Sequence, residues 1–89
     1  MKDKDPNLEN SEPNLWRTPD LYLAGFLKAK GLIFSGVERE GRRAFFLFPQ
    51  TPLLEEFIED FYNGGAVSAL GYKESLRTLR EIIYSGGRP

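Results

Sequence analysis

The hydrophobic side chains of this chain are densest in residues 32–50, where two apolar runs flank a short charged stretch. Folding these residues about Glu40 and Gly41 predicts an antiparallel β-hairpin, because Gly41 can take the positive φ that a tight turn requires. In this register Gly36 lies opposite Phe45. The rest of the chain is expected to pack on this hairpin.

Apolar side chains fall on both faces of the predicted hairpin. Ile33 lies opposite Phe48 on one face, and Phe34 lies opposite Leu47 on the other. A two-stranded ribbon with one face in water would alternate polar and apolar residues, and this one does not. We therefore expect both faces to be covered, either by helices of the same chain or by a second copy that pairs with the hairpin edge.

A helix is predicted before the hairpin, over residues 18–30. Thr18 is the expected N-cap, Pro19 fits the first helical position, and Gly31 can end the helix in a left-handed conformation. Gly25 costs about 1 kcal/mol relative to Ala inside a helix, so we expect it to mark a close approach of this helix to the hairpin. One face is apolar at helical spacing and consists of Tyr22, Leu23, Phe26 and Leu27.

Two further helices are predicted after the hairpin, over residues 53–62 and 68–84. Thr51 and Ser68 are their expected N-caps, and a turn at Asn63-Gly64-Gly65 separates them. The apolar positions of the first are Leu54, Phe57, Ile58 and Phe61, and those of the second are Tyr72, Leu76, Leu79 and Ile83.

The predicted fold is therefore a small α+β domain with the order α-β-β-α-α. Residues 1–17 are polar and charged and are expected to be a disordered leader, residues 18–85 form the domain, and residues 86–89 fray. Trp16 is the exception within the leader. Partial burial against the domain is the preferred interpretation for it, and a role as a partner anchor is the alternative.

Composition excludes several classes of function. The chain has no Cys, so it holds no disulfide and no thiolate site, and it has no His, the commonest general base and metal ligand. The net charge of −1 gives no overall attraction to nucleic acid or anionic lipid. No apolar run is long enough to span a bilayer, and the N-terminus lacks the apolar region of a secretory signal, so we expect a cytoplasmic protein. Because His and Cys are absent, we also expect that the protein is not an enzyme and uses no cofactor.

Acidic side chains gather on one side of the predicted helix over residues 53–62. Carboxylates one turn apart can share a hard cation such as Mg²⁺ or Ca²⁺. A straight helix face does not wrap round an ion, and Ca²⁺ needs about 6–8 oxygen ligands, so a solvated face is the preferred interpretation. These residues are Glu55, Glu56, Glu59 and Asp60.

Basic side chains gather at two other places, the hairpin tip and the last helix. If they converge in space they can contact phosphates, with an aromatic side chain stacking on a base. Residues 18–89 nevertheless contain nine acidic and nine basic side chains, without the basic excess typical of nucleic-acid-binding domains. The candidate contact residues are Arg39, Arg42, Arg43, Lys73, Arg77 and Arg80.

Several segments of the chain together resemble a small bacterial and phage family known only as a domain of unknown function. They are Thr18-Pro19-Asp20-Leu21-Tyr22-Leu23-Ala24, Phe26-Leu27, the glycine-turned hairpin, Phe61-Tyr62-Asn63-Gly64 and Val67-Ser68-Ala69. The likeness covers residues 18–84. It implies a compact autonomous module in bacteria or their viruses, and it carries no catalytic or binding residue to this chain.

The leading functional hypothesis from the sequence is a non-catalytic interaction module that acts through a protein partner or through self-association at the hairpin edge. The alternative is a weak nucleic-acid-binding module that uses the hairpin-tip arginines and the basic side of the last helix.

Overall fold

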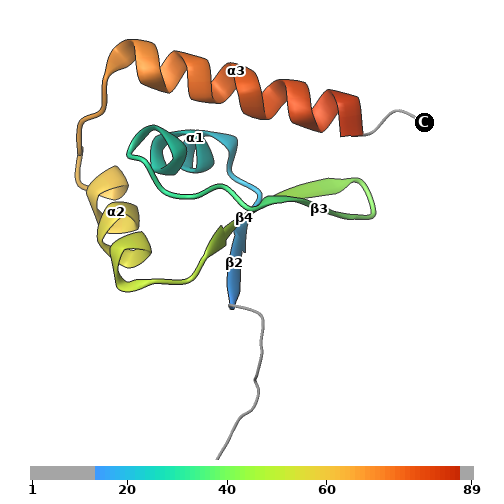
Figure 1. The fold of residues 1–89 in the computed structure, drawn as a ribbon, viewed down its shortest axis with the longest axis horizontal. Coiled ribbons are helices and arrows are strands. Elements are labelled where there is room, and N and C mark those ends of the chain that lie inside the picture. Colours follow the sequence, from blue (N-terminus) through green and yellow to red (C-terminus); the bar gives the residue numbers. More distant parts are fainter. Residues whose placement is uncertain (1–13, 87–89) are drawn as a thin grey trace, which may run out of the picture.

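The computed structural model describes residues 14–86, and the predicted leader before residue 14 and the last three residues lie outside this part. The described chain forms three helices and three strands (Figure 1). In chain order they are β2 (Leu15–Thr18), α1 (Leu21–Ala29), β3 (Gly36–Glu40), β4 (Arg43–Pro49), α2 (Pro52–Tyr62) and α3 (Ala69–Gly86).

The α+β class and the order of the helices are confirmed, but the sheet has three strands, not the two predicted. β2 pairs antiparallel with the free edge of β4, so the strand order is β2-β4-β3. The register places Leu15 beside Pro49 and Thr18 beside Phe46. Residues 15–17 were wrongly assigned to the leader. The strand β2 has only four residues, and an alternation this short does not distinguish a strand from an unstructured tail. At the other end, α3 continues through Gly86, which was expected to fray.

The hairpin register differs from the prediction by two residues. Gly41, at φ +61°, and Arg42 form the turn, so Gly36 pairs with Leu47 and not with Phe45. A shift of two residues keeps the side chains of β3 and β4 on their predicted faces, because side chains alternate along a strand, but Ile33 and Phe34 lie outside β3 and depart from the predicted faces. The strand β3 is also shorter than expected, because the chain bends at Gly36, which has a φ of +127°.

Two of the three predicted helix caps are confirmed. The Thr51 hydroxyl accepts the Leu54 N–H at 3.2 Å, and the Ser68 hydroxyl accepts the Gly71 N–H at 3.0 Å. The N-cap of α1 is Asp20 and not Thr18: its carboxylate accepts the N–H of Tyr22 at 2.9 Å and also that of Leu23. An ionised acceptor at this position also complements the helix dipole.

The centre of the fold is α1 together with β4, not the hairpin alone. The helix α1 contacts α3, α2 and β2 (Figure 1). Five consecutive residues of it, 23–27, are buried. Gly25 was expected to lie against the hairpin, but it faces α3: a Cβ placed there would lie 2.6 Å from the Leu76 Cδ2 atom. The buried core consists of Leu23, Ala24, Phe26, Leu27, Phe46, Phe48, Leu54 and Leu79.

One hydrogen bond outside the helical backbone joins α3 to α1. The Tyr72 hydroxyl donates to the Tyr22 carbonyl oxygen at 3.0 Å. Burial of the phenol, together with the nearby negative charge of Asp20, raises the pKa of Tyr72. The hydroxyl therefore stays protonated and keeps this bond across the physiological pH range.

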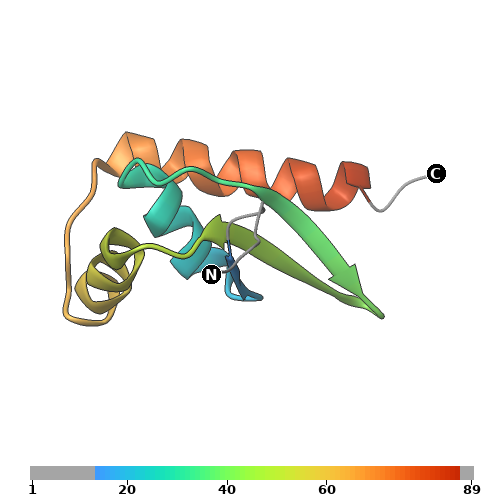
Figure 2. The ribbon, with the colours of Figure 1, turned by 60° about the horizontal axis from the view of Figure 1, so that its bottom comes forward.

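The helices lie on one side of the sheet only (Figure 2). Phe46 and Phe48 point to that side and are fully buried, with the Phe34 ring centroid 5.8 Å from that of Phe48. Phe45 and Leu47 point to the opposite side, as alternation along β4 requires. We call this second side, which carries Leu15, Arg17, Phe45 and Leu47, the outer face of the sheet.

Within residues 14–86, none of the helices combines the length and the apolar character needed to cross a bilayer.

Candidate functional site

Arg39 and Arg43 of the hairpin lie on opposite faces of the sheet. The guanidinium of Arg39 donates to the Ile83 carbonyl oxygen near the end of α3. Arg42 is exposed in the turn. Arg43 lies on the outer face of the sheet, with its Cζ atom 5.2 Å from the centroid of the Phe45 ring.

The basic residues of α3 share one exposed side of that helix. Lys73, Arg77 and Arg80 follow at helical spacing, and Arg77 pairs with Glu74 at 3.0 Å. α3 packs on the helical side of the sheet, whereas Arg43 lies on the outer face. Among the described residues, the six predicted contact residues therefore do not form one continuous basic surface.

Arg17 is a charged residue that the sequence did not single out. Its guanidinium lies 4.1 Å from the centroid of the Phe45 ring and contacts Glu38 at 3.0 Å and Glu40 at 3.4 Å. Desolvation acts to lower the pKa of Arg17, but the hydrogen bonds that its guanidinium donates to Glu40 and Glu38 outweigh this effect and raise the pKa. The outer face is thus covered around Phe45 by charged side chains, where a helix or a second copy was expected. These contacts become apparent only once β2 is known to be a strand.

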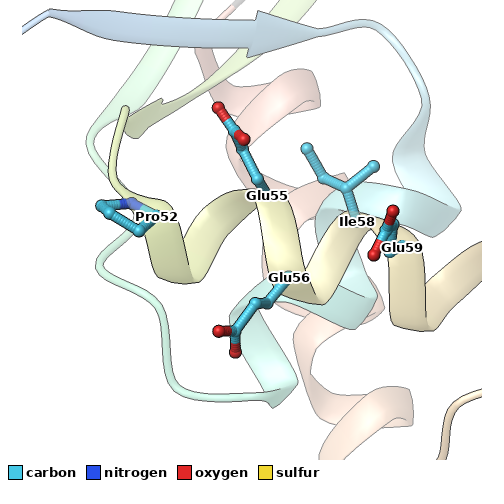
Figure 3. A pocket seen from close by; sticks show the side chains of 5 residues that line it. All are labelled: Pro52, Glu55, Glu56, Ile58 and Glu59. Carbon is cyan, nitrogen blue, oxygen red and sulfur yellow. The ribbon is translucent and has the colours of Figure 1, made fainter.

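The acidic side of α2 does not form a cage for an ion. Glu55 and Glu56 point to opposite sides of the helix (Figure 3). Asp60 lies 3.7 Å from the Lys30 Nζ atom, which also lies over the Phe57 ring. Residues 14–86 contain no group of three acidic side chains placed to hold a metal ion. The arrangement is typical of a solvated negative surface.

An apolar hollow lies where α2 meets the end of β4. We call it the base groove. Its cavity volume is about 330 Å³, and it is lined by Gly31, Leu32, Ile33, Pro49, Thr51 and Leu53.

Three large aliphatic side chains at or beside the base groove lie in solvent. Ile33 is 73% exposed and Leu53 is 46% exposed. Leu15, which is 47% exposed, pairs with Pro49 across the β2–β4 ladder and extends the apolar surface along the outer face. Contiguous apolar surface of this kind, with polar residues around it, is typical of interaction sites.

Local backbone geometry explains why Ile33 points outward. Gly31 ends α1 with a φ of +102°, and the Leu32 N–H returns to the Leu27 carbonyl oxygen at 3.2 Å. Leu32 and Phe34 then turn into the core, which leaves Ile33 between them in solvent. On the other wall, Thr51 caps α2 and places Leu53 in the first turn.

The sequence did not identify the base groove. Ile33 was expected to be a strand residue opposite Phe48, whereas β3 begins only at Gly36. The one available signal was the run of three apolar residues at 32–34, directly before Ser35 and Gly36.

No curated protein and no solved structure matches this chain. A family model does match it: residues 13–85 align with a domain of unknown function, DUF5659, and the chain belongs to that family.

Proposed function

We propose that this chain is a non-catalytic protein-interaction module that docks an apolar segment of a partner protein in the base groove. The observation that carries the proposal is the grouping of Leu15, Ile33 and Leu53, which remain in solvent at one place in a chain with a well-buried core. Aliphatic anchors in a pocket are a usual energetic centre of a protein interface.

The apolar contact alone supports only a weak complex. Covering the exposed parts of Ile33 and Leu53 contributes about 2–4 kcal/mol, since a fully buried aliphatic side chain contributes about 1.5–3 kcal/mol. Because about 4 kcal/mol corresponds to a Kd near 1 mM, further contacts around the groove must add affinity.

Two other functions have less support. Catalysis lacks a histidine, a cysteine and a converging set of carboxylates in the described chain. Nucleic-acid binding is favoured by the exposed row of Lys73, Arg77 and Arg80 and by Arg39, which reaches the end of the same helix. Arg43 lies on the outer face of the sheet and does not extend this surface. A bacterial or phage source and a cytoplasmic location stay predictions.

The docking surface can be tested with a displayed library of random peptides. The chain is immobilised, and bound peptides are recovered and amplified over several rounds without counter-selection against any variant. We expect an enriched group of peptides with aliphatic anchors that binds the unmodified chain and loses at least about tenfold in affinity, or about 1.4 kcal/mol, on Ile33→Asp.

A matched control separates this result from a general effect of added charge. Leu70 is another exposed leucine, at 65%, and lies on α3 away from the groove, so Leu70→Asp should leave peptide binding unchanged. Both substitutions are at exposed positions and should change the free energy of unfolding by less than about 0.5 kcal/mol. Peptides that bind the two variants and the unmodified chain equally would contradict the proposal.

A further inference from the structure

We infer that the segment docked in the base groove is basic, with lysine or arginine residues beside its aliphatic anchor. This inference rests on the proposed function and names the chemical class of its partner. It combines the apolar lining of the groove with the charge of α2, the helix that forms one wall.

The apolar and acidic surfaces of α2 are continuous. Leu53 lines the groove, and Glu56 lies one turn further along the same side of the helix. Pro52, next to Thr51 of the groove, also borders the hollow formed with Glu55 and Glu59 (Figure 3). A segment that leaves the groove along α2 therefore passes carboxylates on successive turns.

The negative charge of α2 is not balanced within the helix. Pro52–Tyr62 contains four acidic residues and no basic one. Lys30 lies beside Asp60 at 3.7 Å, and among residues 14–86 no ion pair involves Glu55, Glu56 or Glu59. Like charges four residues apart, such as Glu55 and Glu59, repel and destabilise a helix. A basic partner relieves this repulsion, whereas an acidic partner adds to it.

The same charge disfavours a second copy of this chain as the occupant. A two-fold contact centred on the base groove brings the acidic sides of two α2 helices into one interface. Like-charge juxtaposition opposes such a contact. Charge complementarity therefore favours a different, basic chain over self-association at this place.

The experiment uses two synthetic fluorescein-labelled peptides with the same central Leu-Ile-Leu sequence. One is flanked by four lysines and the other by four glutamates, and binding to the full chain is followed by fluorescence anisotropy. We expect the lysine peptide to bind, to weaken as NaCl is raised, and to lose about tenfold in affinity on Ile33→Asp; the glutamate peptide should not bind.

Two double variants, each of which removes two negative charges, show which helix attracts the lysine peptide. Glu56→Gln/Glu59→Gln removes two charges from α2, and Glu74→Gln/Glu81→Gln removes two from α3. The α2 variant should bind the lysine peptide about tenfold more weakly, while its melting temperature stays the same or rises because repulsion is removed. The α3 variant should bind like the unmodified chain.

The outcomes separate the inference from the proposed function. If both peptides bind equally and both lose affinity on Ile33→Asp, the inference of a basic partner is wrong and the proposed docking groove is supported. Equal weakening by the α2 and α3 variants would also overturn the inference, because the attraction would then be general. Peptide binding that is unchanged by Ile33→Asp, in this experiment and in the display selection, would overturn both the inference and the proposed function.

Discussion

Replacing Phe46 with alanine is expected to lower the free energy of unfolding by about 3–5 kcal/mol. Phe46 is 1% exposed and packs in the core between β4 and α1, with its ring centroid 6.4 Å from that of Phe34. Removing the ring there leaves a cavity that neighbouring side chains fill only in part. In a chain of 89 residues this is a large share of the total stability.

The neighbouring substitution Phe45→Ala is the control. Phe45 is also largely buried, at 8% exposed, but it lies on the outer face beneath the side chains of Arg17 and Arg43. These long side chains can move and water can enter, so we expect a cost of about 1–2 kcal/mol. Urea unfolding followed by fluorescence of Trp16, the single tryptophan, measures both variants. Equal costs would contradict the distinction between a helical side and an outer face.

Enlarging Gly25 to leucine is expected to destabilise the fold by about 2–3 kcal/mol. Even a Cβ at this position would lie 2.6 Å from the Leu76 Cδ2 atom and 3.3 Å from the Tyr72 Cε1 atom. A whole leucine side chain must therefore push α3 away from α1. Because α3 makes its main contacts with α1, this change also weakens the attachment of the whole helix.

Gly71→Ala provides the matched control for Gly25→Leu. Gly71 lies in α3, and a Cβ there would meet only the Ser68 side chain, at 3.5 Å, which is ordinary contact. Alanine is a better helix former than glycine, so we expect stabilisation of about 0.5–1 kcal/mol. Thermal unfolding by circular dichroism measures both variants. A Gly25→Leu chain as stable as the unmodified one would contradict the close packing of α1 and α3.

The helices were predictable because their signals are local. Periodic apolar residues and the Thr51 and Ser68 caps identify α2 and α3 without knowledge of the fold. The cap of α1 was misplaced by two residues because Thr18 and Asp20 are both good N-cap residues. What decides between them is that Thr18 is the last residue of β2, and its pairing with β4 is a long-range contact.

The sheet and the candidate site were less predictable because they depend on such long-range contacts. The strand β2 comes from a stretch whose composition is typical of a disordered tail, and only its pairing with β4 makes it a strand. Burial of Phe45 under Arg17 depends on the same pairing. The exposure of Ile33 depends on the inward turn of Leu32 and Phe34 after α1, in a segment that was predicted to be a strand.

The central claim is that Ile33 lies in solvent in the free chain and is covered when a partner docks. Because the chain has no cysteine, an Ile33→Cys variant carries a single thiol whose rate of reaction with a disulfide reagent reports its accessibility. We expect this thiol to react nearly as fast as a free cysteine peptide at all protein concentrations, and more slowly once the lysine-flanked peptide is bound. A thiol that is protected in the free chain, or that reacts at the same rate with and without bound peptide, would contradict the account.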